Sequence, residues 1–111
     1  MGARIDRIEN WRVLALSSGF CAKAMADAID AQEREVRAYF ANGFRRSLRV
    51  WLRGERYAEA ARLIAGGAAL KEVATAVGMR HAGHLTRGFI AFYGVTPTEF
   101  RDGRAGVLPE L

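Results

Sequence analysis

The chain has 111 residues and a formal net charge of +5, with 50% of its residues hydrophobic and 26% charged. This length and composition fit one folded globular domain and exclude wholesale disorder. Uncharged stretches are too short to cross a bilayer and the first residues form no apolar signal core, so we expect a cytoplasmic protein without membrane contact. The single cysteine, Cys21, excludes an internal disulfide framework, and we expect its side chain to be buried or half-buried.

Positive charge is concentrated in the second half of the chain. Residues 1–44 hold six Lys or Arg against six Asp or Glu, whereas residues 45–111 hold eleven against six. A basic excess of this kind points to a polyanionic partner such as nucleic acid. We therefore expect the second half to provide most of a basic surface.

The apolar pattern predicts an all-α protein of about seven helices. Alanine is frequent, both prolines come late, and no run of β-branched residues alternates with polar ones. Apolar residues at a spacing of three to four predict helices over about residues 4–16, 22–29, 30–41, 47–65 and 70–77, a sixth that ends before Gly94 and a seventh that follows Thr96. Residues 103–111 are expected to form a C-terminal tail.

Two of these helices begin with the pattern of a capping box. Asp30 with Glu33, three residues later, predicts the start of the third helix. Thr96, Pro97 and Glu99 predict the start of the seventh, because threonine can cap the first free amides and proline suits the first helical turn. The glutamate is expected to reach back toward the capping residue.

The sequence contains an internal repeat. Similar residues recur at an offset of 48 or 49 positions, in residues 25–30 and 73–78, and in Val36 and Phe40 against Leu85 and Phe89. Each copy is a short helix, a tight turn and a second helix, which is the helix-turn-helix plan. A small alanine lets the two helices cross closely, and the turn position holds Asp30 or Gly78, residue types that tolerate a left-handed backbone. We therefore predict helix-turn-helix units over about residues 22–41 and 70–93.

Motifs between residues 51 and 101 follow one another at a specific spacing. They are Trp51-Leu52, Arg56, Ala60, Leu63-Ile64, Glu72-Val73-Ala74, Gly78-Met79, Leu85, Arg87, Phe89, Gly94-Val95, Pro97 and Phe100-Arg101. In this order they resemble the DNA-binding domain of the AraC/XylS family of bacterial transcription regulators, over about residues 14–101. The resemblance implies one domain at residues 1–102, in which a linker helix at 47–65 joins the two units. The chain resembles the family's small single-domain members, which bind as monomers, and equally a domain excised from a longer member.

The resemblance also implies that the second helix of each unit reads DNA. The residues carried over by position include Gln32, Arg34 and Arg37 in the first unit, and His81, His84, Thr86 and Arg87 in the second. Arg80, which precedes His81, is a further candidate for DNA contact. Ala38, Ala82 and Gly83 stand where family members often place base-contacting side chains. An alanine or a glycine reads a base edge only by methyl contact or close approach, so His84 and Arg87 are expected to do most of the reading in the second unit.

A run of arginines precedes and enters the linker helix. For Arg45, Arg46, Arg49 and Arg53, phosphate neutralisation and ordinary solvation are both consistent with the pattern, with phosphate contact favoured for Arg45 and Arg46. Arg56 resembles the family's structural arginine. It is expected to pair with an acid and to hold the linker helix.

Catalytic and metal chemistry find little support. The sequence has no serine, histidine and acid set within reach of one another and no glycine-rich phosphate loop, so we expect no enzyme. His81 and His84 are three residues apart on a helix, but no third ligand is near them in sequence. We therefore expect neither a metal nor a cofactor.

Two functions from different classes remain. The first is a nucleoid-associated, sequence-specific regulator that binds double-stranded DNA with two recognition helices in adjacent major grooves, about 34 Å apart. The alternative is a helical adaptor of the same fold that binds RNA polymerase or another regulator, with weak or non-specific DNA binding. An intermediate case, motivated by the charge distribution, has the second unit on DNA and the first on a protein partner.

Overall fold

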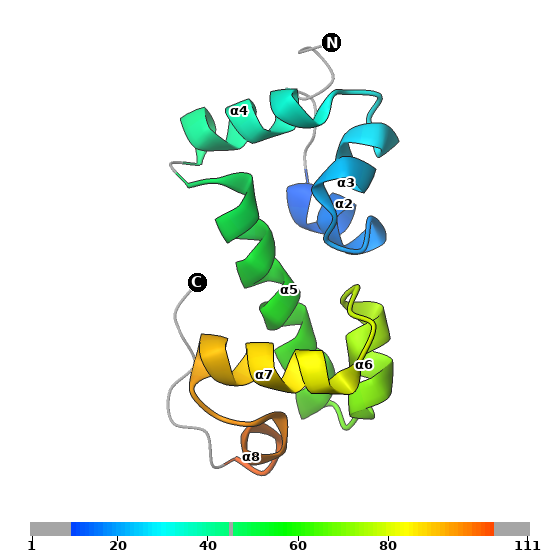
Figure 1. Ribbon diagram of the computed structural model, residues 1–111, viewed down its shortest axis with the longest axis vertical. Coiled ribbons are helices and arrows are strands. Elements are labelled where there is room, and N and C mark those ends of the chain that lie inside the picture. Colours follow the sequence, from blue (N-terminus) through cyan, green and yellow to red (C-terminus); the bar gives the residue numbers. More distant parts are fainter. Residues whose placement is uncertain (1–9, 45, 104–111) are drawn as a thin grey trace. The chain divides into compact units, whose positions relative to one another are not determined.

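The computed structural model describes residues 10–44 and 46–103, and in these residues it contains seven helices and no strand (Figure 1). The helices are α2 (Trp11–Ser17), α3 (Ala22–Ala28), α4 (Glu33–Gly43), α5 (Leu48–Ala65), α6 (Leu70–Ala76), α7 (Ala82–Tyr93) and α8 (Pro97–Arg101). The predicted all-α class with about seven helices is confirmed. Among the described residues, no helix has the length and apolar character needed to span a membrane.

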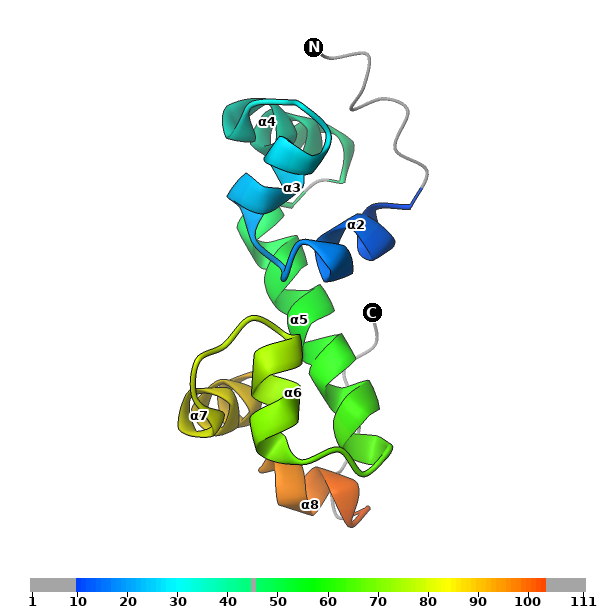
Figure 2. The same cartoon turned by 90° about the vertical axis from the view of Figure 1, so that its right-hand side faces the viewer.

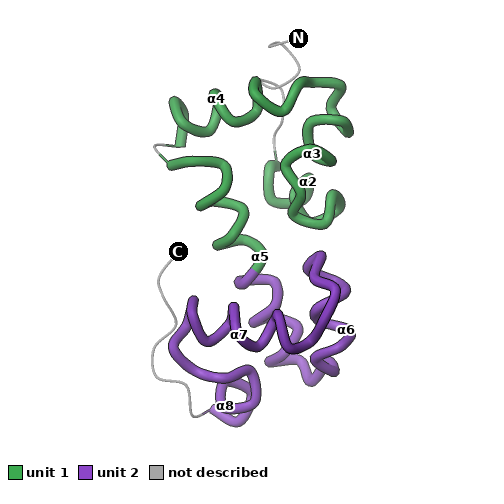
Figure 3. Tube along the Cα trace, viewed as in Figure 1, with its two compact units in different colours: residues 1–56 green, residues 57–111 purple. Residues whose placement is uncertain are grey.

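The chain divides into two compact units, residues 1–56 and residues 57–111 (Figure 3). The boundary falls within α5, so this helix joins the units and contributes its first part to unit 1 and its last part to unit 2. In unit 1, α3 packs against α2 and α4; in unit 2, α7 packs against α6 and α8 (Figure 2). Each unit therefore contains one helix-turn-helix pair, α3 with α4 and α6 with α7.

An aromatic cluster forms the core of unit 1 beneath α4. Val36 and Phe40, both on α4, are fully buried. The Phe40 ring centroid lies 4.9 Å from Trp11, 4.9 Å from Trp51 and 4.4 Å from Phe44. Aromatic pairs at these separations stabilise a core beyond the area that they bury. One face of α4 is thereby held against α2 and α5, which leaves its other face at the surface.

Unit 2 has an equivalent core beneath α7. Leu85 and Phe89 are fully buried, as their predicted counterparts are in unit 1. Tyr57 of α5 is buried and stacks on Phe92 with ring centroids 5.2 Å apart. This contact requires Gly88, because a Cβ atom there would lie 2.8 Å from the Tyr57 Cζ and closer still to the Tyr57 hydroxyl. The glycine lets α7 pack directly on the phenol ring.

The two helix-turn-helix turns have the same backbone geometry. Asp30 and Gly78 both adopt the left-handed conformation, with φ of 56° and 81°. In each unit, the amide after the turn residue donates to the carbonyl of the buried alanine five residues earlier, at 2.9 Å for Ala26 and 2.8 Å for Ala74. The prediction that these turn positions are left-handed is confirmed. Aspartate, the residue at position 30, is one of the few non-glycine residue types that adopt this conformation readily.

The turns that precede these pairs also match. The Phe20 amide donates to the Ala15 carbonyl at 2.8 Å, and the Ala68 amide donates to the Leu63 carbonyl at 3.1 Å. Both bonds connect positions related by the same offset of 48 residues. The repeat therefore extends upstream of the segments in which the sequence revealed it.

In each unit, one arginine side chain donates hydrogen bonds to carbonyls of this upstream turn. The Arg56 Nη2 donates to the Phe20 carbonyl at 3.0 Å, and its guanidinium lies 6.0 Å from the Phe20 ring centroid. Arg101 donates to the Ala68 carbonyl at 2.6 Å and to the Ile64 carbonyl at 3.3 Å. The predicted ion pair of Arg56 with an acid is therefore wrong. The Phe20 carbonyl takes the place of the acid. It lies in the turn after α2, and carbonyls at the end of a helix lack partners within the helix.

The predicted start of the third helix is also wrong. The helix begins at Glu33 with Gln32 as its N-cap, and the glutamate that reaches back to the cap amide is Glu35, at 2.8 Å. Asp30 cannot cap it, because an N-cap needs an extended backbone and Asp30 is left-handed. At Thr96 the predicted box is confirmed, with reciprocal bonds of 3.0 and 2.9 Å to Glu99.

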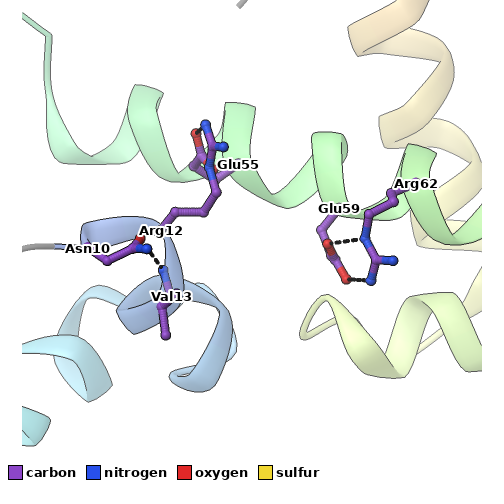
Figure 4. Close-up of polar contacts among 6 residues, drawn as sticks. All are labelled: Asn10, Arg12, Val13, Glu55, Glu59 and Arg62. Atoms are coloured by element: carbon purple, nitrogen blue, oxygen red, sulfur yellow. Dashed lines mark hydrogen bonds and ion pairs between the residues drawn. The ribbon is translucent and has the colours of Figure 1, made fainter.

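Three further expectations concern the ends of the chain and the cysteine. The described first helix starts at Trp11, capped by the Asn10 side chain at 3.0 Å from the Val13 amide (Figure 4). Residues 4–9 of the predicted helix lie outside the described residues, as does the predicted tail beyond Gly103. Cys21 is exposed, contrary to expectation. It immediately precedes α3, where its backbone but not its side chain takes part in the helix start.

Candidate nucleic-acid interface

The exposed face of α7 carries cationic and polar side chains. His84 and Arg87 are exposed and lie one turn apart, while Leu85 and Phe89 anchor the opposite face in the core. The residues of α7, all of them described, include no Asp or Glu. A helix that is buried on one side and cationic on the other can contact a polyanion without repulsion from its own acids.

Arg87 extends back along α7 toward the position that lacks a side chain. A Cβ atom on Gly83 would lie 3.8 Å from the Arg87 Nη1, which is ordinary contact distance. Arg87 makes no hydrogen bond or ion pair with any residue that the structure describes. Its guanidinium donors are thus available to an external acceptor. The same unit also places Arg80 and His81, both exposed, in front of α7.

In α4 the candidate side chains are exposed, but one is paired. Gln32, Arg34 and Arg37 are exposed, opposite the buried Val36 and Phe40. The Arg37 Nε and Nη2 donate to the same oxygen, Oε2 of Glu33, at 2.9 and 2.6 Å. Such i,i+4 pairs are neighbours on one helix face. Part of the positive charge of this helix is therefore balanced by an acid on its own surface.

The two helices place their cations at different positions. Aligned at the offset of 49, equivalent positions hold Arg34 and Gly83, Glu35 and His84, Arg37 and Thr86, and Ala38 and Arg87. Wherever one helix has a cation, the other has an acid or a side chain without charge. The scaffold is repeated, but the exposed chemistry is not.

The basic run at the start of α5 lies in unit 1. Arg46 and Arg49 are exposed, whereas Arg45 lies outside the described residues. Ser47 caps the helix, its hydroxyl accepting from the Val50 amide at 3.1 Å. The unit that holds α4 therefore also presents exposed arginines around the start of α5.

Both acids within α5 are paired with arginines (Figure 4). The Glu55 Oε1 accepts from the Arg12 Nε at 2.7 Å in unit 1, and the Glu59 Oε2 accepts from the Arg62 Nη2 at 2.6 Å in unit 2. The hydrogen bond from Arg62 lowers the pKa of the Glu59 carboxyl. Each acid of α5 is therefore balanced by an arginine of its own unit.

The structure groups the candidates by unit. Unit 1 holds Gln32, Arg34, Arg37 and Arg46, and unit 2 holds Arg80, His81, His84, Thr86 and Arg87, with Thr86 half-buried. Sequence reasoning missed the pairing of Arg37 with Glu33, although their spacing of four was visible. It also missed the contact of Arg101 with the Ala68 carbonyl, for which the sequence contains no local signal. No cluster of three or more metal-ligating side chains occurs in the described residues.

Comparison with known proteins connects this geometry to a family. Residues 25–103 match a family model described as a helix-turn-helix domain, a range that begins within α3 and contains α4 to α8. A search of curated proteins finds no match.

Solved structures show the same fold at low sequence identity. The C-terminal domain of the two-component response regulator yesN from Fusobacterium nucleatum superposes with a TM-score of 0.72 and 19% identity, over 89% of this chain and 98% of that one. For a DNA-binding transcriptional dual regulator from Escherichia coli K-12 the values are 0.69 and 20%, over 87% and 94%. For a transcriptional regulator with an AraC-type DNA-binding domain from Chromobacterium violaceum they are 0.63 and 16%, over 81% and 91%.

The family model covers more than half of the chain and includes parts of both units. The resemblance inferred from the sequence is thereby confirmed. The chain belongs to the AraC-type helix-turn-helix family and is a DNA-binding transcription regulator.

Proposed function

We propose that the protein recognises specific double-stranded DNA sites, with α4 and α7 as recognition helices in two successive major-groove segments. The observation that carries this proposal is the exposed cationic face of α7, free of acids and held from behind by fully buried side chains. The same anchoring recurs in α4. A rigid helix is a better platform for base contacts than a loop, because its side chains need less ordering on binding.

In the second unit, Arg87 is the principal base-reading residue. An unpaired guanidinium can donate two parallel hydrogen bonds to O6 and N7 of guanine. His84, one turn earlier, adds a second donor or acceptor on the same face. Arg80, His81 and Thr86 lie beside these residues and contribute to phosphate and base contacts at the edge of the groove.

In the first unit, Gln32, Arg34 and Arg37 read the second segment, and Arg45 and Arg46 neutralise phosphates. Glutamine can pair with adenine, and arginine with guanine, so α4 and α7 specify different bases. Phosphate contacts set the register and give binding its salt dependence. In this proposal residues 1–102 act as one DNA-binding domain that works as a monomer, followed by a C-terminal tail at residues 103–111.

Selection from a pool of random duplexes at several salt concentrations tests this function. The expected result is a motif in two parts, with centres about one helical turn or 34 Å apart, and an affinity that falls steeply with salt. Salt-sensitive binding without an enriched motif would refute sequence-specific recognition. Absence of binding at low salt would instead favour an adaptor that uses this fold against RNA polymerase or another regulator.

A further inference from the structure

We propose that Glu33 is a positioning residue for DNA recognition: it holds the Arg37 guanidinium in one orientation, so that α4 discriminates bases more sharply while binding DNA less tightly overall. This inference rests on the proposed recognition of DNA by α4. Glu33 itself is not required to touch DNA.

The geometry of the pair leaves one edge of the guanidinium available. Both Arg37 atoms that contact Glu33, Nε and Nη2, donate to the single oxygen Oε2, at 2.9 and 2.6 Å. An arginine has five N–H groups, so three remain, including two parallel ones on the edge formed by Nη1 and Nη2. Two parallel donors match the two acceptors of guanine. The side chains of Arg37 and Glu33 remain 48% and 40% exposed, so the pair lies at the surface.

The repeat provides an internal comparison. At the offset of 49, Glu33 corresponds to Ala82 and Arg37 corresponds to Thr86. The second recognition helix therefore has no equivalent pair, and its Arg87 makes no ion pair among the described residues. Since both helices are anchored by the same buried pattern, anchoring of the helix does not require the acid at residue 33.

Two physical effects of Glu33 act in different directions. Its negative charge repels phosphates, which weakens contact with any DNA sequence. Its hydrogen bonds restrict the long Arg37 side chain before binding, which reduces the ordering needed for a correctly placed guanine. Specificity is the difference between two affinities, so the repulsion, which acts on every sequence alike, leaves discrimination unchanged, whereas the ordering of Arg37 increases it.

A purely structural role for Glu33 makes a different prediction. An acid in the first turn of a helix stabilises the helix dipole, and its loss would lower stability alone. That role would leave the ratio of affinities for two DNA sequences unchanged. The ratio is therefore the decisive measurement, with thermal unfolding recorded in parallel.

The experiment compares wild type, Glu33→Gln, Arg37→Ala and the double variant in the full chain. Each is titrated with the duplex that emerges from the selection, and with a duplex in which the bases of the α4 segment are exchanged. Glu33→Gln is expected to bind the exchanged duplex about threefold more tightly and to lose about fivefold in the ratio of the two affinities. In the Arg37→Ala background, the same substitution should leave the ratio unchanged.

Asp27→Asn is the matched control. Asp27 lies on α3 in the same unit and pairs with Lys23 at 3.4 Å, so its substitution removes the same charge without touching Arg37. We expect it to tighten binding to both duplexes equally. An unchanged ratio in Glu33→Gln, or an equal change with and without Arg37, would overturn the role of Glu33 alone. A wild-type protein that binds both duplexes equally would overturn the proposed function together with it.

Discussion

At the scale of single residues, α4 and α7, the proposed recognition helices, hold their arginines in different ways. The helix of Arg87 contains no acid, and the Arg87 side chain extends toward Gly83, whereas Arg37 forms an ion pair with Glu33. An unpaired arginine contributes its whole positive charge to DNA binding. The charge of a paired arginine is partly balanced, so its main contribution is the orientation of its remaining hydrogen-bond donors. Base recognition should therefore be more sensitive to loss of Arg87 than to loss of Arg37.

Arg87→Ala is expected to weaken binding to the selected duplex by about 1–3 kcal/mol and to relax specificity at one base position. The reason is the loss of a bidentate contact to a base edge. Arg62→Ala removes the same charge from the same unit, but Arg62 is on α5 and paired with Glu59, so its effect should be small. Fluorescence anisotropy titrations at two salt concentrations measure both. Equal effects of the two substitutions would refute base reading by Arg87.

Gly88→Ala is expected to lower the free energy of unfolding by about 1–3 kcal/mol, because the new methyl group would overlap the Tyr57 ring. Gly83→Ala on the same helix meets only ordinary contacts and should raise stability by up to about 1 kcal/mol, as alanine favours helix. Urea denaturation of both variants gives the comparison. If Gly88→Ala were as stable as Gly83→Ala, α7 would not pack on Tyr57 as described.

At the scale of elements, the recurring feature is a turn that depends on one left-handed residue. Asp30 and Gly78 occupy equivalent positions, and the amide that follows each bonds back to the preceding helix. The backbone geometry is the same, but the energy differs. Aspartate tolerates the left-handed region at some cost, whereas glycine adopts it at almost none.

Gly78→Ala is therefore expected to destabilise the protein by about 1–2 kcal/mol, and Asp30→Gly to change stability only slightly, in the stabilising direction. The methyl group of alanine crowds the carbonyl oxygen in a left-handed residue. Thermal unfolding followed by circular dichroism measures both variants. Tolerance of alanine at residue 78 would contradict the requirement for a left-handed backbone in this turn.

At the scale of the whole molecule, each unit has its own core and its own arginine that hydrogen-bonds to backbone carbonyls. Arg56 binds the Phe20 carbonyl in unit 1, and Arg101 binds the Ala68 and Ile64 carbonyls in unit 2. The helix α5 belongs to both units, ending one and beginning the other. Stability should accordingly differ from one unit to the other rather than be uniform along the chain.

Arg56→Ala and Arg101→Ala should each lose about 1–3 kcal/mol through a carbonyl left without its donor, and each loss should be local. Amide hydrogen exchange is expected to speed up in α2, α3 and α4 for the first variant, and in α6, α7 and α8 for the second. Mass spectrometry of peptides from each unit resolves the two patterns. A uniform increase in both variants would mean that the units unfold only together.

The sequence by itself determined the all-α fold, the repeat and the buried positions of α4 and α7. Val36, Phe40, Leu85 and Phe89 were identified correctly because helical spacing depends on residues three or four apart. The left-handed turn residues and the Thr96 capping box followed from equally local chemistry. The exposure of the candidate side chains follows from the same helical periodicity.

Only the tertiary structure decided which distant groups meet. The bond from Arg56 to Phe20 spans 36 residues, and the bond from Arg101 to Ala68 spans 33. The dependence of Gly88 on Tyr57 is equally remote in sequence. Every residue has a backbone carbonyl, so the sequence does not show which carbonyl an arginine will bind. For this reason the sequence suggested an acid as the partner of Arg56, and the bond to the end of a helix could not be predicted. The start of α4 was misassigned because an aspartate suits both an N-cap and a left-handed turn. In the structure Asp30 is the turn residue between α3 and α4, and these two helices pack against each other.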